Sequence, residues 1–460
     1  MSSKDDFVKI FVKAIRQGNA AVFGGAGLSN LCSWKELLSP LASDIGLDIE
    51  KENDLLSVAQ FYENNESRKG INSAIKDAFS KTNINDNIDI LTRLPISTYW
   101  TTNYDKSLEQ GLQRANRKPD VKSESSDLST IEPGRDAIVY KMHGDVDSPD
   151  RAVLTKNDYD LYELKRPLFR TALKGDLISK VFLFIGFSFE DPNFDYMLSQ
   201  IHSLLGDNVA NHYCFFKREH DDYAKKRQDL QVYNLAKYGI NVVFVESFDE
   251  ITEVLREVER KYKQHNVFIS GSAYNYAPWN EQDAESFATN LARALVRNDN
   301  RITSGFGYGI GDAIVNGALD EIYKNKYGHI DEYLCLHPFP QNISNPEEKA
   351  QLWTQYRKSM ISKTGIAIFM FGNKQNTDTK KTVDSQGCLE EFQIAKKNKN
   401  IIIPIGSTGY VAKKIWDEVN KNLKDYPYLS KDMEKLNSET NIDKIVEIII
   451  GIIKKINMGE

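Results

Sequence analysis

The sequence has few of the features that mark several common classes of protein. Its 460 residues include four cysteines, at positions 32, 214, 335 and 388, which lie far apart in the chain. Cysteines spaced in this way form neither a C-x-x-C half-site for zinc nor a disulfide framework. We therefore expect no bound metal and a protein of the reducing cytoplasm.

Long hydrophobic runs and an excess of basic charge are also missing. No stretch of 18 uncharged apolar residues occurs, and charged residues interrupt the isoleucine-rich tail at 442–456, which predicts an amphipathic closing helix rather than a membrane span. Asp5 and Asp6 argue against a signal peptide. Lys plus Arg number 59 and Asp plus Glu 65, a net charge of −6. This balance argues against binding to nucleic acid or to an anionic membrane.

The sequence does contain short apolar runs that alternate with longer amphipathic patterns, in two successive series. The run Val181-Phe-Leu-Phe-Ile185 is apolar throughout, as in a strand covered on both faces. The alternation predicts an α/β protein with two Rossmann-like domains, each a largely parallel sheet with helices on both faces. We expect these domains at 1–262 and 266–460, because a new series begins at Val267. The polar segment 375–387 is expected to be a loop.

The expected strands can be placed by residue number. They are 20–23, 97–101, 137–140, 181–185, 212–216 and 241–245 in the first domain, and 267–270, 333–336, 366–371 and 401–405 in the second.

Four polar motifs follow predicted strands of the first domain. They are Gly25-Ala-Gly-Leu-Ser29, Thr102-Asn-Tyr-Asp105, His143-Gly144 and Gly186-Phe-Ser188. The glycine-rich turn suits a pyrophosphate, and ligands of such sheets bind at the carboxyl ends of strands. The four motifs are therefore expected to converge. Taken singly, Asn103 is better explained as a helix cap and His143 as a structural histidine.

Together these motifs resemble those of the sirtuin-like family of NAD-consuming domains, over most of residues 1–260. The resemblance implies that NAD is the substrate and that Asn103 and His143 lie in the reaction centre. Asn103 would hold a water or a ribose hydroxyl, and His143 would act as a base or as a ribose-positioning group. The residues implied around the dinucleotide are Gly25, Ala26, Gly27, Ser29, Asp105, Gly186 and Ser188.

The chain departs from classical sirtuin deacetylases in two places. They continue the first motif with Gly-Ile-Pro-Asp-Phe-Arg, where this chain has Asn30-Leu-Cys-Ser-Trp-Lys35, and they carry a four-cysteine zinc module that is not evident here. These departures favour cleavage of NAD by water, as in an NAD glycohydrolase, over protein deacylation. A sirtuin-type protein deacylase is the first alternative.

The second domain carries its own set of glycine-rich turns. Its motifs are Gly271-Ser272, the loop Thr303–Gly311, Arg357 and Gly387-Cys-Leu-Glu-Glu391. They resemble those of the SLOG family of Rossmann-like nucleotide-binding domains, over about residues 265–425. Enzymatic SLOG members carry a Pro-Gly-Gly run before the last motif, where this chain has Val383-Asp-Ser-Gln-Gly387. The resemblance therefore implies nucleotide sensing rather than hydrolysis.

A sirtuin-like domain followed by a SLOG domain resembles the NAD-depleting effectors of the bacterial Thoeris antiphage system. The resemblance implies that a cyclic ADP-ribose isomer, made by a TIR-domain partner protein, binds the second domain and activates NAD cleavage in the first. It also implies a homo-oligomer, with a tetramer expected. The implied activator contacts are Gly271, Ser272, Arg357, Lys374 and Glu390, and the sequence does not distinguish Glu390 from Glu391. A nucleotide sensor that only scaffolds partners is the second alternative.

Overall fold

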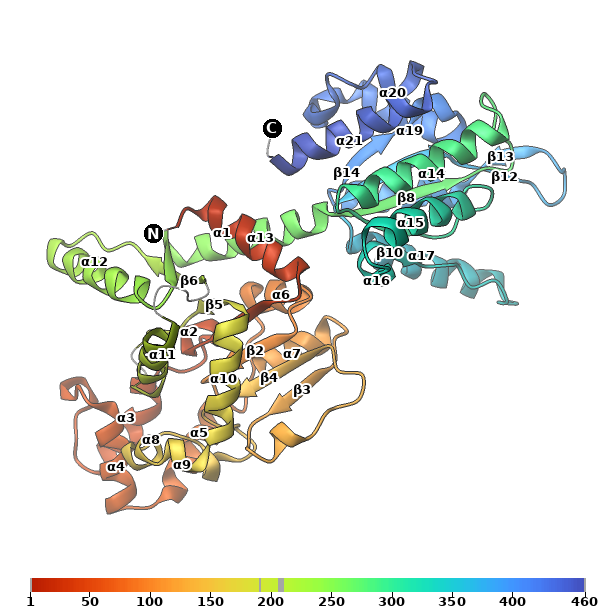
Figure 1. Ribbon diagram of the computed structural model, residues 1–460. Helices are drawn as coiled ribbons and strands as arrows, with labels where there is room; N and C mark the ends of the chain where they lie inside the picture. Colours follow the sequence, from red (N-terminus) through yellow and green to blue (C-terminus); the bar gives the residue numbers. More distant parts are fainter. Residues whose placement is uncertain (1, 190–191, 206–210, 459–460) are drawn as a thin grey trace. The chain divides into compact units, whose positions relative to one another are not determined.

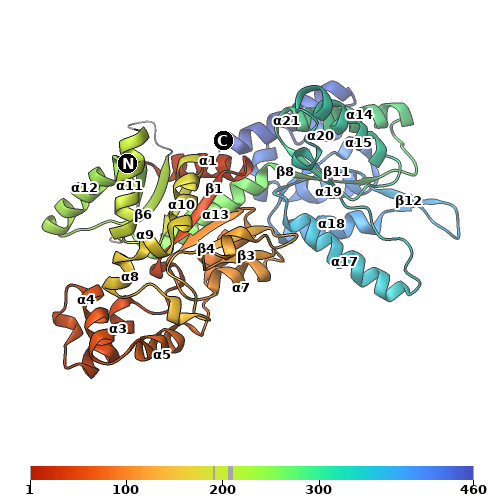
Figure 2. The same ribbon diagram turned by 60° about the horizontal axis from the view of Figure 1, so that its bottom comes forward.

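A computed structural model describes residues 2–189, 192–205 and 211–458 of the chain. The chain divides into two compact units, Met1–Glu259 and Arg260–Glu460, and the boundary falls within helix α13 (Phe248–Gln264). Each unit is built on a parallel sheet flanked by helices (Figures 1 and 2). The predicted α/β fold class is therefore confirmed.

The sheet of the first unit has seven strands in the order β3-β4-β2-β1-β5-β6-β7, and every pair is parallel. The chain runs outward from β1 through β2 on one side and from β5 on the other, so the strand order reverses between β1 and β5. Such a reversal opens a crevice at the carboxyl ends of the two central strands, where ligands of these folds bind. The strands are β1 (Ala20–Gly24), β2 (Thr98–Thr101), β3 (Pro119–Lys122), β4 (Ala137–Lys141), β5 (Val181–Ile185), β6 (His212–Lys217) and β7 (Ile240–Val245).

Helices cover both faces of this sheet because its side chains alternate between two apolar sides. The register aligns Trp100, Phe23, Phe184 and Cys214 on one face, where Phe169 of α10 packs at 6.4 Å between ring centroids from Trp100. Residues one position away face the opposite side. There, Phe7 of α1 packs 5.2 Å from the ring of Tyr213. The helices of this unit, besides α13, are α1 (Lys4–Arg16), α2 (Ala26–Ser29), α3 (Trp34–Asp44), α4 (Leu55–Asn65), α5 (Arg68–Phe79), α6 (Asp86–Arg93), α7 (Ser107–Arg114), α8 (Lys156–Asp160), α9 (Tyr162–Lys165), α10 (Pro167–Ser179), α11 (Pro192–Leu205) and α12 (Asp222–Ala236).

The long connection between β1 and β2 forms a small core of its own. Helices α3, α4 and α5 gather with α8 (Figures 1 and 2) and bury Leu38, Val58 and Ile71 among them. A capping box starts α3: the Ser33 hydroxyl accepts from the backbone N–H of Glu36, and the Glu36 carboxylate accepts from the backbone N–H of Ser33. The segment Asn30–Lys35, which departs from the sirtuin pattern, therefore leads into α3 at Trp34.

The sheet of the second unit has five parallel strands in the order β10-β9-β8-β11-β14. Its strand order reverses between β8 and β11, which again opens a crevice at the strand ends. One continuous apolar core fills this unit and includes every residue of β11. The strands are β8 (Asn266–Ser272), β9 (Arg301–Ser304), β10 (Leu334–Leu336), β11 (Ile366–Phe371) and β14 (Ile401–Pro404). The helices are α14 (Glu281–Arg297), α15 (Gly311–Asn325), α16 (Ile330–Tyr333), α17 (Pro346–Ser362), α18 (Gln386–Lys397), α19 (Tyr410–Lys421), α20 (Lys435–Ser438) and α21 (Ile442–Met458).

The expected loop at 375–387 is more ordered than the sequence suggests. It contributes to an antiparallel pair, β12 (Asn373–Gln375) and β13 (Thr382–Asp384), and then to the start of α18. The buried side chain of Asn373 anchors this hairpin, because its Oδ1 accepts from the N–H groups of Tyr274 and Asn275, each at 2.9 Å. The polar composition therefore predicts the turn of the hairpin correctly, but it does not predict the two short strands on either side of the turn.

The isoleucine-rich tail forms helix α21, as predicted. It buries Ile445, Ile449 and Ile452 in the core of the second unit. Across the described part of the chain, no helix has the length and apolar character that a membrane span requires.

Two candidate ligand sites at the strand ends

The first candidate site begins where the turns after β1 and β5 touch. The N–H of Gly25 donates to the carbonyl of Ile185, and the N–H of Gly27 donates to the carbonyl of Gly186, both at 3.0 Å. A Cβ atom on Gly25 would lie 2.3 Å from the Gly186 oxygen, and Gly186 has a φ of 64°. Glycines are thus required for the contact between the two turns. This contact also uses two N–H groups that would otherwise be available to a pyrophosphate.

A cavity of about 530 Å³ lies beside these turns and is called the first cavity below. Its volume falls in the range of small-molecule sites. Five of the residues predicted for the first domain line it: Ala26, Gly27, His143, Gly186 and Ser188. Its other lining residues are Trp34, Asn53, Asp54, Leu55, Leu56, Thr102, Tyr159 and Phe187.

Asn103 lies in a smaller pocket that shares Ala26, Trp34 and Thr102 with the first cavity. Its Nδ2 donates to the carbonyl of Gly25 at 3.0 Å and to Ser29 Oγ at 3.1 Å. Because both amide hydrogens are used, the side chain can offer its Oδ1 as an acceptor to a water or a ribose hydroxyl. The orientation of this amide is set within the protein before any ligand binds.

Asp105 and Ser29 lie behind Asn103 rather than in the wall of the first cavity. Asp105 Oδ2 accepts from Ser29 Oγ at 2.9 Å, and Asp105 Oδ1 accepts from the N–H of Ser107 at 2.8 Å. Asp105 therefore orients the Ser29 hydroxyl, which in turn receives a hydrogen bond from Asn103. Of the residues predicted around the dinucleotide, Gly25, Ser29 and Asp105 act behind the wall, as supports for it.

His143 is 3% exposed and lies in the wall of the first cavity, directly after β4. Its ring meets Tyr159 edge-on at 5.4 Å, and its backbone carbonyl accepts from the N–H of Val153 at 2.8 Å. The next residue, Gly144, has a φ of 96°, and a Cβ there would lie 3.1 Å from Ala152 Cα. The backbone around His143 is thus held against the segment that follows it.

A second histidine in the same sheet shows the structural alternative. His212 begins β6, and its Nδ1 accepts from the backbone N–H of Phe182 at 3.3 Å. Burial lowers the pKa of His212 to about 4, so its imidazole is neutral at physiological pH. His212 is therefore a structural histidine, whereas His143 faces a cavity.

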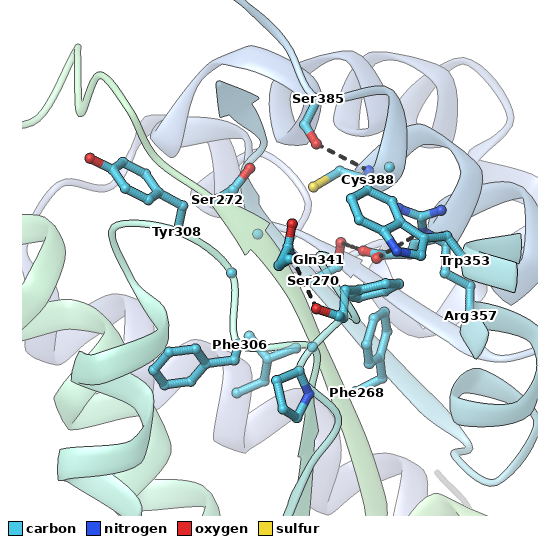
Figure 3. Close-up of a pocket in the computed structure, with 18 residues that line it drawn as sticks. Phe268, Ser270, Ser272, Phe306, Tyr308, Gln341, Trp353, Arg357, Ser385 and Cys388 are labelled. Carbon is cyan, nitrogen blue, oxygen red and sulfur yellow. Dashed lines mark hydrogen bonds and ion pairs between the residues drawn. The ribbon is translucent and has the colours of Figure 1, made fainter. Parts of the chain in front are cut away.

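The second candidate site is a cavity of about 390 Å³ at the ends of β8 and β9, called the second cavity below (Figure 3). Three predicted activator contacts, Gly271, Ser272 and Arg357, line it. The glycine-dense loop packs closely on β8, since a Cβ on Gly307 would lie 1.9 Å from the carbonyl oxygen of Gly271. As in the first unit, some of the glycines in the motif are required by close packing of the backbone rather than by a ligand.

The side chain of Arg357, on α17, contacts aromatic rings and two carboxylates. Its guanidinium lies 4.9 Å from the ring centre of Phe339 and 5.8 Å from that of Trp353, whose indole covers it in Figure 3. Its Nη1 donates to Glu390 at 2.7 Å, and its Nε lies 3.4 Å from Glu391. Arginine is suited to such a place because its flat, permanent cation both stacks on rings and pairs with carboxylates.

The structure separates the two neighbouring glutamates. Glu391 lines the second cavity and accepts from Ser270 Oγ at 2.6 Å, whereas Glu390 is not among the lining residues and accepts from the Thr354 hydroxyl. Burial raises the pKa of Glu391, although the hydrogen bonds from Ser270 and Arg357 oppose this effect. Lys374 is exposed on β12 and is also absent from the wall.

The aromatic residues of the second cavity were not predicted from the sequence. Phe306 and Tyr308 belong to the glycine-dense loop, while Phe339 and Trp353 come from the segment after β10 and from α17. The aromatic spacing matches neither a helix nor a strand pattern across these segments. In the first cavity, Trp34 belongs to the segment in which this chain departs from the sirtuin motif, and that departure was the only sequence feature that pointed to it. No sequence feature pointed to the lining segment Asn53–Leu56.

The described residues contain no group of three or more His, Cys, Asp and Glu side chains able to hold a metal ion.

Comparison with known proteins agrees with this two-part organisation. Residues 97–243 match a SIR2-like domain, and residues 250–456 match the Sir2- and TIR-associating SLOG family. The chain is 42% identical to "NAD(+) hydrolase ThsA" of Bacillus cereus (strain MSX-D12), over 97% of each chain. It is 41% identical to the protein of the same name from Cytobacillus dafuensis, over 100% of this chain and 98% of that one.

A more distant relative covers a smaller part of the chain. "Defense-associated sirtuin 2" of Bacillus subtilis is 24% identical over 46% of this chain and 22% of its own length. The full-length matches are decisive, because they extend through both units and both cavities. The chain therefore belongs to the ThsA family of NAD(+) hydrolases.

Proposed function

We propose that the first unit hydrolyses NAD to nicotinamide and ADP-ribose, and that a cyclic ADP-ribose isomer bound in the second cavity activates it. One observation supports the catalytic part: His143 lines the first cavity, and Asn103 lines the small pocket that shares wall residues with it, at the reversal point of the sheet in a chain of the ThsA family. Because the relatives are named NAD(+) hydrolases, NAD is the substrate that this site would receive.

The side chains around the first cavity suit the chemistry of this cleavage. Loss of nicotinamide leaves an oxocarbenium-like ribose, and the leaving group departs neutral, so it needs little help from an acid. The protein must hold the ribose, place a water and accept its proton. Asn103 Oδ1 would accept a hydrogen bond from the water or from a ribose hydroxyl. His143 would take the proton or hold the ribose hydroxyls.

The rest of the first cavity would bind the dinucleotide. Ala26, Gly27, Gly186 and Ser188 line the side formed by the turns after β1 and β5. The exposed edge of these turns offers backbone groups and one hydroxyl to the phosphates. Trp34 lies between the first cavity and the small pocket that holds Asn103, so its indole would lie against the nicotinamide riboside end of the substrate.

The second cavity suits recognition of an anionic nucleotide. Arg357 would pair with a phosphate, and α18, a helix of 12 residues, begins at the cavity with Gly387 and Cys388 in its wall. Aromatic rings offer stacking surfaces to adenine. Glu391, which lines the cavity, would accept hydrogen bonds from ribose hydroxyls in place of Glu390.

Membership of the family supports a proposal for the biological setting. We infer that a TIR-domain partner protein makes the activator, that the chain works as a homo-oligomer in the cytoplasm, and that NAD depletion is its part in antiphage defence. The matched family model is described as Sir2- and TIR-associating, which supports the link to a TIR partner.

The test is product analysis on the full-length protein. Incubation with NAD and each available cyclic ADP-ribose isomer should yield nicotinamide and ADP-ribose in equal amounts, without any peptide. Products that appear only with an acyl-lysine peptide would assign a deacylase instead. Intact NAD under all of these conditions would assign a sensor that only scaffolds partners.

A further inference from the structure

Lys141, the last residue of β4, is fully buried, and its ammonium group contacts four oxygen atoms. Nζ donates to the carbonyl of Tyr104 at 2.9 Å, to the carbonyl of Asp105 at 2.7 Å and to Asp145 Oδ2 at 2.5 Å. It also lies 3.0 Å from Glu109 Oε1. Each hydrogen of the ammonium group can therefore point at an oxygen.

A buried cation of this kind is costly, so its presence calls for an explanation. Burial by itself would lower the pKa of Lys141, but the carboxylates of Glu109 and Asp145 raise it overall, so the side chain stays charged. Burial also raises the pKa of Glu109. Apolar residues of similar volume often stabilise a fold as well as a buried ion pair does. Stability alone therefore gives weak grounds for a lysine at this position.

The partners of Lys141 belong to the two segments that carry the proposed reaction centre. Tyr104 and Asp105 directly follow Asn103 at the end of β2, and Asp145 lies two residues beyond His143 at the end of β4. Nζ is thus an internal bridge between the two segments. The N–H of Val146 adds a backbone bond to the carbonyl of Tyr104 at 3.0 Å.

The bridge also reaches Asn103 through side chains. Lys141 holds the backbone of Asp105, whose carboxylate holds the hydroxyl of Ser29, which accepts from the amide of Asn103. A shift of the β2 segment relative to the β4 segment would therefore move Asn103 against His143. Displacements of about 1 Å between reacting groups can reduce a rate about 100-fold.

We propose that Lys141 is a positioning residue for NAD hydrolysis, which holds the Asn103 segment and the His143 segment at a fixed separation. The inference rests on the proposed function of the first cavity. It predicts that loss of the bridge lowers kcat and leaves KM for NAD nearly unchanged. The dinucleotide would be held largely by the turns after β1 and β5, and those turns contact each other through Gly25 and Gly186.

Lys122 provides a matched control in the same sheet. It is 3% exposed on the edge strand β3, pairs with Asp120 at 2.6 Å and donates to the carbonyl of Thr130 at 2.8 Å. It is not among the residues that line the first cavity. Lys122→Met thus removes a buried lysine that also pairs with a carboxylate and a backbone carbonyl, and it leaves the Lys141 bridge intact.

The experiment compares Lys141→Met/Asp145→Asn, which removes one charge of each sign, with Lys122→Met and the wild type. Steady-state NAD cleavage is measured with the cyclic ADP-ribose isomer that gives the highest wild-type rate, alongside thermal melting. For the double variant we expect kcat to fall about 30- to 100-fold and KM to change less than about threefold. Lys122→Met should keep kcat within about threefold of wild type.

A wild-type kcat in the double variant, with a matched melting curve, would overturn the proposal. Equal losses of kcat in the Lys122→Met control would also overturn it, because the effect would then reflect general loss of stability. If the double variant does not fold, Lys141→Gln, whose amide keeps donors at a shorter reach, is used and should show the same split between kcat and KM.

The parallel variants Asn103→Ala and His143→Ala separate this proposal from the proposed function. Full activity in both of them would reject the reaction centre itself. Loss of activity in both, together with full activity in the Lys141 variants, would reject the positioning role alone.

Discussion

The two cavities occupy the same place in their folds but differ in their chemistry. Each lies at the carboxyl ends of central strands where a parallel sheet reverses its strand order. At the first cavity, His143 lies in the wall, and Asn103 lies in the adjoining small pocket with its amide held by Gly25 and Ser29. In the second cavity, Arg357 is stacked on aromatic rings and paired with carboxylates.

The comparison shows that the carboxyl ends of the central strands form a cavity in both folds, and that the side chains around each cavity determine what it can bind or catalyse. Groups that are oriented in advance by buried hydrogen bonds suit a reaction, because they need no rearrangement when charge develops. A cation among rings and carboxylates suits recognition of an anionic nucleotide, because the ligand can replace existing partners. This contrast supports the proposal that the reaction takes place at the first cavity and that the activator binds in the second.

The largest expected effect is on turnover in the first unit. Asn103→Ala and His143→Ala should each lower NAD cleavage by about 100-fold or more, the scale of a lost base or positioning group. Binding of the activator to the second unit should be unchanged, as calorimetry with the most effective cyclic ADP-ribose isomer would show. Activity within a few-fold of wild type in both variants, with matched melting curves, would contradict the assignment.

The next effect is on activator binding. If Arg357 pairs with a phosphate of the activator, Arg357→Ala removes a charge-assisted hydrogen bond, and activator affinity should fall by about 1.5–3 kcal/mol, or about 10- to 150-fold. High activator concentrations should restore turnover in this variant, whereas Asn103→Ala should stay inactive at any concentration. Wild-type affinity in Arg357→Ala, measured by calorimetry, would remove Arg357 from the activator site.

The neighbouring glutamates give a sharper contrast within the second unit. Glu391→Gln should weaken activator binding about tenfold, because Glu391 lines the cavity, while Glu390→Gln should change it less than about threefold. Both substitutions keep the size of the side chain, and calorimetry on the pair measures the difference directly. The opposite order would assign the contact to Glu390 instead.

The smallest effect concerns stability and distinguishes the two histidines of the first unit. The pKa of His212 is lowered to about 4 in the folded protein, so the unfolded chain binds a proton first as the pH falls. Its contribution is fully present above the ordinary histidine pKa of about 6.5 and is lost as the pH falls from there through about 4. By pH 5.5 the loss should be about 1 kcal/mol.

Urea unfolding between pH 7.5 and 5.5 measures this loss. His212→Gln should remove about that much of the pH dependence, since glutamine does not titrate, whereas His143→Ala should leave the His212 contribution in place. An unchanged pH dependence in His212→Gln would show that His212 is already protonated or exposed in the folded protein.

Much of the fold could be predicted because burial patterns are local. The apolar runs at 181–185 and 366–371 correspond to β5 and β11, both central strands with helices on each side. Two strands of the parallel sheets were missed, besides the β12–β13 hairpin at the expected loop. The edge strand β3 (Pro119–Lys122) is short and polar, and β9 (Arg301–Ser304) merges in sequence with the glycine-dense loop that follows it.

The sites were predictable only in part, because they depend on which side of an element a residue faces. The motifs placed Asn103 and His143 near one cavity, but the backbone packing of Gly25 against Gly186 is a long-range contact that no local pattern reveals. The choice between Glu390 and Glu391 depends on the rotation of α18 against β8. Lys141 is 37 residues from its hydrogen-bond partner Tyr104 in the chain, so no local pattern predicts the bridge.

The most direct test of the account is a titration of NAD cleavage against the activator in wild type, Arg357→Ala and Asn103→Ala. If the second cavity senses the activator and the first performs the reaction, Arg357→Ala should need a higher activator concentration and still reach the wild-type maximum rate. Asn103→Ala should bind the activator normally and stay inactive. A reduced maximum rate in Arg357→Ala with an unchanged midpoint would contradict this division of roles between the two units.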